Sequence, residues 1–292
     1  MATTSSRCCS TCRRRGTSRR ANSSTCGRWP NSPTTAAPRS ARSAACSTGS
    51  RISSDVRSPD LPGLVIHLLA EAGDLARGTI EVEGADHRHL FRARRLKVGD
   101  RVRLVDGRGA ARWSVVDHVT ARRAVLRVGG EAPVFEPARR VALFVSAVRP
   151  ERAAWLVEKA TELGLRELRW FVSERTSRSL PERALERQRR VAKSALEQSG
   201  GSWLPEIAEP VPLKEAPIGA GAVALHPGAP TPFIAVAGSA EAIVVGPEGG
   251  FSEREVEELA GCGVVPAHFG PRVLRTETAA VAALAVALTA MS

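Results

Sequence analysis

The spacing of apolar and polar residues divides the chain into two differently built parts. From "LVIHLLAE" at Leu64 to about Pro133, short alternating runs such as "GTIEVEG" indicate strands with one buried face. In "GDRVRLVDGRGAARWSVVDHV" the turn signal Asp106-Gly107 separates two alternating runs, which predicts a hairpin. We therefore expect a small antiparallel β-barrel in residues 64–135.

After "EAPVFEPARR" the spacing changes to continuous apolar runs that alternate with amphipathic segments. "VALFVSAV" is typical of a buried parallel strand, and "PERAAWLVEKATELGL" predicts a helix from Pro150 to about Gly164. The alternation continues through "RELRWFVSER", "LPERALERQRRVAKSALEQSG", "GAVALHP", "EAIVVGPEGG", "VPAHFGPRVL" and the apolar helix "ETAAVAALAVALTAM". Residues 138–292 are thus expected to form an α/β domain with a mainly parallel sheet.

Composition changes this picture mainly at the N-terminus. The net charge is +12, but residues 1–63 contain many Arg and only Asp55 and Asp60 as acids, so they hold most of it. They are rich in Ser and Thr and lack a helix or strand period, which indicates a disordered leader, either a mis-assigned translation start or a transit peptide. The pair Cys9 and Cys12 has no second pair at zinc-finger distance, so we expect no metal. No apolar run reaches the ~18 residues of a membrane span, and we expect no membrane association.

A basic segment, "DHRHLFRARRLKVGD", lies between the predicted strands of the barrel. His89, Arg92, Arg95 and Lys97 are its candidate RNA-binding residues, because Arg and Lys contact phosphates regardless of base sequence. A solvated helix face is an equally good interpretation of the charge alone.

Three loops follow predicted parallel strands, and ligands bind at the carboxyl ends of such strands. They are Leu225 to Pro227, Gly246 to Gly250 and Gly270 to Thr278. The second contains Glu248 and no Lys, which argues against a phosphate and for a cationic or hydroxyl-bearing ligand. Ser252 and Glu255 form a capping-box pattern after this loop, and Thr276 or Thr278 is the expected N-cap of the last helix.

The segments "GPEGGFSEREVEEL" and "GPRVLRTETAAVAAL" resemble the C-terminal signature of the RsmE-type ribosomal RNA methyltransferases of the SPOUT superfamily. The likeness extends through "VEKATELGL", "SERTSRS", "EQSG", "LPEI" and "LHP", and covers about Leu64 to Met291. It implies a trefoil-knotted, mainly parallel sheet with helices, preceded by a PUA-like barrel. It also implies a cytoplasmic homodimer that uses S-adenosylmethionine to methylate N3 of a uridine in small-subunit (16S) ribosomal RNA, free or in the assembled subunit.

The same resemblance assigns roles to particular residues. The implied cofactor-binding residues are Leu225, His226, Pro227, Gly246, Pro247, Glu248, Gly249, Gly270, Leu274, Arg275 and Thr276. Arg275 is the candidate for stabilising the enolate charge of a uridine that loses its N3 proton, and Glu277 is a candidate base or orienting group. One departure is Gly200-Gly201-Ser202-Trp203, where the family usually has an Arg.

Three other functions fit parts of the pattern. One is a SPOUT RNA methyltransferase acting on a ribose 2′-hydroxyl, against which the N-terminal barrel and "RTETA" argue. Another is a catalytically silent RNA-binding or ribosome-assembly protein, which the changed segment at Gly200 favours. The third is a nucleotide-dependent enzyme with "GPEGG" as its phosphate loop, which Glu248 disfavours.

Overall fold

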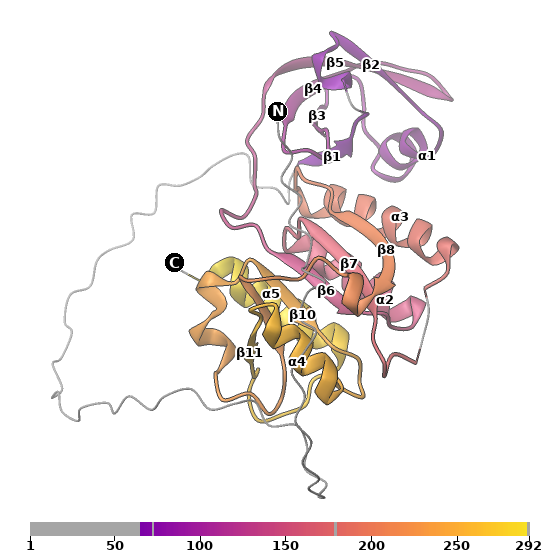
Figure 1. The fold of residues 1–292 in the computed structure, drawn as a ribbon. Helices are drawn as coiled ribbons and strands as arrows, with labels where there is room; N and C mark the ends of the chain where they lie inside the picture. Colours follow the sequence, from indigo (N-terminus) through magenta and orange to yellow (C-terminus); the bar gives the residue numbers. More distant parts are fainter. Residues whose placement is uncertain (1–64, 72, 178–179, 291–292) are drawn as a thin grey trace, which may run out of the picture.

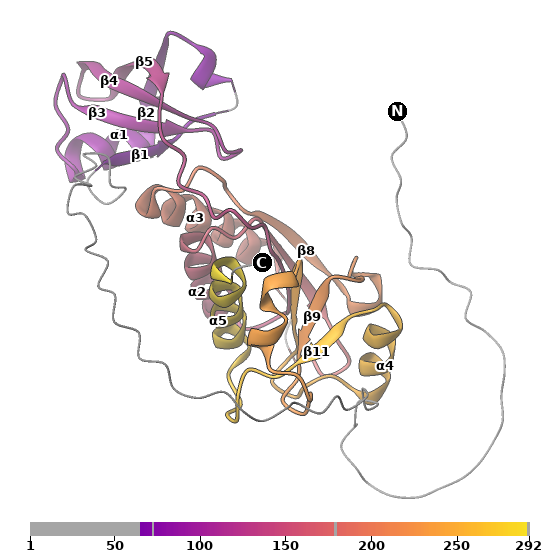
Figure 2. The same ribbon diagram turned by 90° about the vertical axis from the view of Figure 1, so that its left-hand side faces the viewer.

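The computed structural model describes residues 65–71, 73–177 and 180–290, which form two sheets with separate cores (Figure 1). The smaller sheet stands beyond one end of the larger one, close to the helix α3 (Glu182–Ser199) (Figure 2). The predictions made for residues 1–63, including Cys9 and Cys12, lie outside the described residues.

The smaller sheet is curled and has the strand order β1-β3-β4-β5-β2. Its strands are β1 (Ile66–Leu69), β2 (Thr79–Glu83), β3 (Arg101–Val105), β4 (Ala111–Val119) and β5 (Arg123–Glu131), with a short 3₁₀ turn, η2 (Asp74–Ala76), after β1. β3 and β4 form the expected hairpin, in which Asp106 Oδ1 accepts hydrogen bonds from the amides of Arg108 and Ala110. Burial alternates along β2, as the sequence pattern predicted, with Ile80 and Val82 in the core.

One pairing differs from the antiparallel barrel that we expected. β1 runs parallel to β3, and the other pairs of this sheet are antiparallel. Strands joined by a tight hairpin must be antiparallel, whereas β1 and β3 are separated by β2 and a helical segment. A connection of that length permits parallel pairing.

The basic segment connects β2 to β3 as a short helix, α1 (Gly84–His87), that continues into a π-helical turn, η3 (Arg88–Ala93). Leu90 anchors it in the barrel core, and His87 Nε2 donates a hydrogen bond to the carbonyl of Thr120 at 3.1 Å. Arg95 follows with a φ of 59°, the one non-glycine residue at positive φ among those described. These contacts fix the backbone, so the long basic side chains project from a rigid support.

The larger sheet has the order β11-β9-β10-β6-β7-β8, and all its pairs are parallel. Its strands are β6 (Ala142–Ser146), β7 (Glu167–Val172), β8 (Glu206–Pro212), β9 (Ala222–Leu225), β10 (Ala242–Val245) and β11 (Val265–Ala267). Its helices are α2 (Pro150–Glu162), α3 (Glu182–Ser199), α4 (Glu253–Gly261) and α5 (Thr276–Thr289), with 3₁₀ turns η4 (Leu213–Glu215), η5 (Phe233–Ala235) and η6 (Ala237–Ser239). The expected α/β alternation is confirmed, and β8 is an addition to it.

Helices cover both faces of this sheet, so its central strands are buried on both sides (Figure 1). Along β6, Leu143 and Val145 pack on the side of α2, α3 and α5, whereas Phe144 packs on the side of α4. This explains why the strand reads as a continuous apolar run rather than an alternating one. The apolar C-terminal helix predicted from the sequence is α5, which contributes Leu284 to the same core.

The two sheets are fastened together by a fully buried guanidinium. Arg103, on β3, donates hydrogen bonds to the carbonyl of Gly200 at 2.9 Å and to Ser202 Oγ at 2.6 Å. It also donates to the carbonyl of Pro133 in the connection between the sheets. The segment Gly200–Trp203, which departs from the family pattern, is therefore bound by an Arg that comes from the barrel. Glu197 adds a second fastening by accepting from the amide of Leu69 at 3.0 Å.

Candidate functional site

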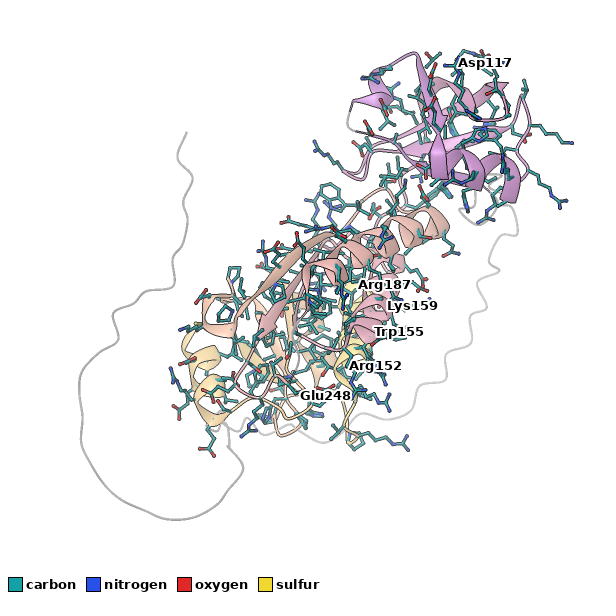
Figure 3. All side chains as sticks on the ribbon, turned by 90° about the vertical axis from the view of Figure 1, so that its right-hand side faces the viewer. Asp117, Arg152, Trp155, Lys159, Arg187 and Glu248 are labelled. Carbon is teal, nitrogen blue, oxygen red and sulfur yellow. The ribbon has the colours of Figure 1, made fainter. Side chains whose placement is uncertain are left out.

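The three loops selected from the sequence meet in one pocket at the carboxyl ends of β9, β10 and β11. The pocket is lined by Leu225, His226, Pro227, Val245, Gly246, Pro247, Glu248, Gly250, Phe251, Phe269, Gly270, Arg272, Val273, Leu274, Thr276 and Ala279. Glu248 lies at the end of the molecule opposite to Asp117 of the barrel (Figure 3). The pocket is thus built by the α/β part alone and lies at the end of the molecule remote from the barrel of the same chain.

Glycines in the loop after β10 are required by close packing and by backbone conformation. A Cβ on Gly246 would lie 3.0 Å from the ring of Phe251, which is itself buried. Gly250 has a φ of 70°, and its amide closes a turn with the carbonyl of Pro247 at 2.8 Å. The backbone can therefore approach a ligand closely, while the exposed Glu248 supplies a carboxylate at the rim.

Hydrogen bonds at the start of α4 hold this loop in place. Ser252 and Glu255 form the predicted capping box: Ser252 Oγ accepts from the amide of Glu255, and Glu255 Oε2 accepts from the amide of Ser252. The other carboxylate oxygen of Glu255 accepts from the amide of Glu174 at 2.8 Å, in the loop after β7. From that loop, Arg175 donates to the carbonyl of Gly249 at 2.9 Å. Two loops distant in sequence are thereby held as one unit.

The third loop is joined to the second at the start of α5. Thr276 Oγ1 donates to the carbonyl of Gly246 at 3.0 Å. The N-cap of α5 is Arg275, without a side-chain cap, so the expectation that Thr276 or Thr278 caps this helix was wrong. Thr276 is the first helical residue, and its hydroxyl is used to hold the neighbouring loop instead of the helix end.

His226 lines the opposite wall and is half-buried. The amide of Gly228 donates to its Nδ1 at 3.1 Å. Burial lowers the pKa of the His226 imidazole below its ordinary value, so the ring is neutral at pH 7. The pocket therefore has an acidic rim at Glu248 and a neutral wall at His226, and Arg272 is the one basic lining residue.

The structure separates the sequence-selected residues into three groups. Most of the eleven proposed for cofactor binding line the pocket, and Gly249 and Arg275 are not among the lining residues. Arg275 is exposed at the head of α5. Glu277 is only 3% exposed and forms an ion pair with Arg152 of α2. Sequence reasoning missed Phe251 and Phe269, although each stands beside a selected glycine, and it missed Arg152, for which the sequence held no signal.

The four candidate RNA-binding residues lie in the barrel and not in the pocket. His89, Arg92, Arg95 and Lys97 are all exposed on η3 and the turn after it. None of them forms an ion pair within the ranges that the structure describes. In those same ranges, no group of three or more His, Cys, Asp or Glu side chains is arranged to hold a metal ion. No helix there is long and apolar enough to cross a bilayer.

Fold and pocket together define an RNA methyltransferase. A family model described as an RNA methyltransferase domain matches residues 136–288, and one described as an RNA methyltransferase PUA domain matches residues 82–128. More narrowly, the chain belongs to the ribosomal RNA small subunit methyltransferase E family. It is 31% identical over 221 residues to the family member of Mycobacterium tuberculosis, covering 70% of this chain and 83% of the relative.

Solved structures agree with this assignment. A probable rRNA-methyltransferase from Porphyromonas gingivalis is 29% identical with a TM-score of 0.65, covering 73% of this chain and 94% of the other. A putative methyltransferase from Legionella pneumophila, in complex with its bound cofactor SAM, is 25% identical with a TM-score of 0.63, covering 77% and 97%. The SPOUT-type fold class with a preceding PUA-like domain is thereby confirmed.

Proposed function

We propose that the protein transfers a methyl group from S-adenosylmethionine to N3 of a uridine in small-subunit ribosomal RNA. The observation that carries this proposal is the meeting of the three diagnostic loops in one pocket, in a chain of this family. The curated relatives are ribosomal RNA small subunit methyltransferases. The Legionella pneumophila structure, whose fold is similar to that of this chain, contains bound SAM.

The pocket residues fit S-adenosylmethionine on chemical grounds. The ligand has an adenine and a ribose but no phosphate, and the lining contains Phe251, Phe269 and backbone groups but no Lys. Glu248 suits the ribose hydroxyls or the positive charges of the ligand, and Arg272 suits its carboxylate. These are the residues that would hold the cofactor, which supplies an electrophilic methyl group when bound.

The RNA substrate contributes a weakly acidic N3–H, whose proton must leave as the methyl group arrives. We assign Arg275 to stabilise the negative charge that spreads to the uridine carbonyl oxygens. Its exposure at the head of α5, beside the pocket residues Leu274 and Thr276, supports a contact with an incoming base. Glu277 is assigned an orienting role, because its buried carboxylate is already engaged by Arg152 and is poorly placed to accept the proton.

The remaining parts of the proposal concern assembly. Residues 64–135 would form the RNA-binding barrel, and residues 138–292 would form the methyltransferase domain. The barrel would contact RNA phosphates through His89, Arg92, Arg95 and Lys97. From Ala279 to Leu288, α5 is apolar on every side, yet a strip of its side chains is only partly buried, which supports a second copy of the chain packing on it. We propose a homodimer that acts on cytoplasmic small subunits and needs no metal.

The test is to incubate the purified full chain with labelled S-adenosylmethionine and small ribosomal subunits that lack the modification. Label recovered in N3-methyluridine is the expected result, identified by mass spectrometry of the nucleosides. Label in a ribose-methylated nucleoside would favour the 2′-O alternative. Cofactor binding without transfer would favour a silent assembly protein. In Arg275→Gln we expect transfer to fall at least tenfold with cofactor affinity retained, whereas an unchanged rate would exclude Arg275 from the reaction.

A further inference from the structure

A second hollow, which we call the interdomain groove, lies between the barrel and the amino ends of the parallel strands. Its volume is about 810 Å³. The barrel contributes the loop after β3, including Arg108, and the α/β part contributes Arg140, Arg166 and Trp203. The groove lies at the amino ends of the strands and the cofactor pocket at the carboxyl ends of strands of the same parallel sheet, so the two sites are at opposite ends of the sheet.

The three guanidiniums of the groove are uncommitted. In the described part of the chain, neither Arg108, Arg140 nor Arg166 forms an ion pair or donates a side-chain hydrogen bond. Arg103 and Arg139 differ from these three residues, because their guanidiniums donate hydrogen bonds to backbone carbonyls. Fifteen N–H donors, about five per guanidinium, thus remain available to a ligand.

Trp203 holds one of these groups in a fixed orientation. The guanidinium carbon of Arg166 lies 2.9 Å from the centre of the Trp203 ring, and that of Arg140 lies 5.6 Å from it. Trp203 is itself fixed, because Glu136 accepts from its amide at 2.9 Å and its ring packs against Gly109. Burial lowers the pKa of Arg166, and the neighbouring charge of Arg140 lowers it further, as expected of two cations held close together.

The groove also contains carboxylates, but half of them are engaged. Asp106 Oδ1 accepts from two backbone amides, and Glu167 is paired with Arg169. Four carboxylates and three guanidiniums thus line the groove, but in the described part of the chain no carboxylate forms an ion pair with Arg140 or Arg166, which lie together at Trp203. An anion that presents several oxygens at a regular spacing, with planar groups to stack on a guanidinium, satisfies this arrangement. Single-stranded RNA has both features.

We propose that the interdomain groove binds the sugar-phosphate backbone of a single-stranded RNA segment, with Arg140 and Arg166 on its phosphates and Trp203 as the residue that positions Arg166. The inference rests on the proposed function only in naming the anion as RNA. Since the groove and the cofactor pocket lie at opposite ends of the sheet, the segment bound here is distinct from the target nucleotide held by the same subunit. Trp203 is a positioning residue, and Arg140 and Arg166 make the contacts.

The test measures binding of the full chain to a short fluorescent single-stranded oligoribonucleotide by anisotropy, over a range of salt concentrations. The double variant Arg140→Gln/Arg166→Gln is expected to bind at least tenfold more weakly, and its salt dependence should become shallower by about 0.7 per lost phosphate contact. Arg254→Gln, which removes a charge from the exposed face of α4, is the control and should change neither value. Trp203→Leu should weaken binding less than the double variant, and Trp203→Phe should restore it.

Two results would overturn the inference. One is a double variant with native affinity and native salt dependence. The other is a change in the particle mass of the double variant, which would make the groove an interface between copies of the chain. Affinity for S-adenosylmethionine is measured in parallel by calorimetry and should stay unchanged in every variant. Failure of the groove to bind RNA is thereby distinguishable from failure of the proposed methyl transfer.

Discussion

At the scale of single residues, His226 links the cofactor pocket to pH. The Gly228 amide donates to Nδ1, so the neutral ring carries its proton on Nε2, and protonation of Nδ1 would break this bond. Burial lowers the pKa of the imidazole, which means that the folded state disfavours the charged ring. The neutral His226 ring therefore contributes fully to the free energy of unfolding above the ordinary pKa of about 6.5. This contribution is lost as the pH falls from there through the lowered pKa.

We expect affinity for S-adenosylmethionine to be constant near pH 7 to 8 and to fall as the pH drops below about 6, because an imidazolium would face a cationic ligand. Isothermal titration calorimetry across this range measures the effect. His226→Asn should remove the pH dependence, whereas His118→Asn, at an exposed position of β4, should leave it intact. A native chain with the same affinity at pH 5.5 and pH 8 would contradict the role given to His226.

The residues that sequence reasoning found and missed differ in how far their partners lie along the chain. The turn of the loop after β10 and the capping box of Ser252 and Glu255 join neighbours a few residues apart, so the local pattern was sufficient to select these residues. Glu277 and Arg152 are 125 residues apart, and Arg103 and Gly200 are 97 apart. A single sequence carries no record of such pairs, because Glu277, Arg152 and Arg103 each read alone as an ordinary surface charge and Gly200 reads as an ordinary helix-end glycine.

At the scale of elements, α4 organises the loops around the pocket through one carboxylate. Glu255 is 4% exposed, and its two oxygens accept from amides of two different loops. In Glu255→Gln one of these amides would face an NH₂ group, which leaves a buried donor unsatisfied at about 1–3 kcal/mol. We expect urea denaturation to register that loss and calorimetry to register about tenfold weaker binding of S-adenosylmethionine.

The matched control for this prediction is Glu257→Gln, on the exposed face of the same helix. It makes the same chemical change without touching either loop, so stability and cofactor affinity should stay close to native. Equal behaviour of the two variants would show that the bridge between the loops is irrelevant to binding.

The sequence predicted helices and strands correctly where the apolar pattern matches the faces that are buried in the fold. β10 is apolar throughout and β6 is apolar up to Ser146, because both faces of the sheet are covered, and the Gly/Pro loop after β10 marks the end of that strand. β8 was missed because Pro210 and Pro212 argue against a strand. It tolerates them as the edge strand of the sheet, where unpaired positions need no amide donor. Only the completed sheet order reveals that it is an edge.

At the scale of the whole molecule, the surface of α5 is the clearest sign of an unfilled contact. Ala283, Leu284 and Ala287 face the core of their own domain. Val281, Ala282, Ala285 and Val286 are only partly buried, and they follow one side of the helix at spacings of four. A helix without a polar face is stable at a surface only when something apolar covers it. α2, which packs beside α5, also carries an exposed large apolar side chain, Trp155, which is 42% exposed.

If a second copy covers this surface, the native chain should have twice the mass of one chain by size-exclusion chromatography with light scattering. Val286→Glu would place a charge within the contact and should yield a monomer of unchanged circular dichroism, since the side chain is half-exposed in the single chain. Val98→Glu makes the same change at an exposed site in the barrel, 61% accessible, and should remain dimeric. A native chain that is monomeric at micromolar concentration would exclude the dimer. It would also leave the apolar side of α5 without a physical explanation.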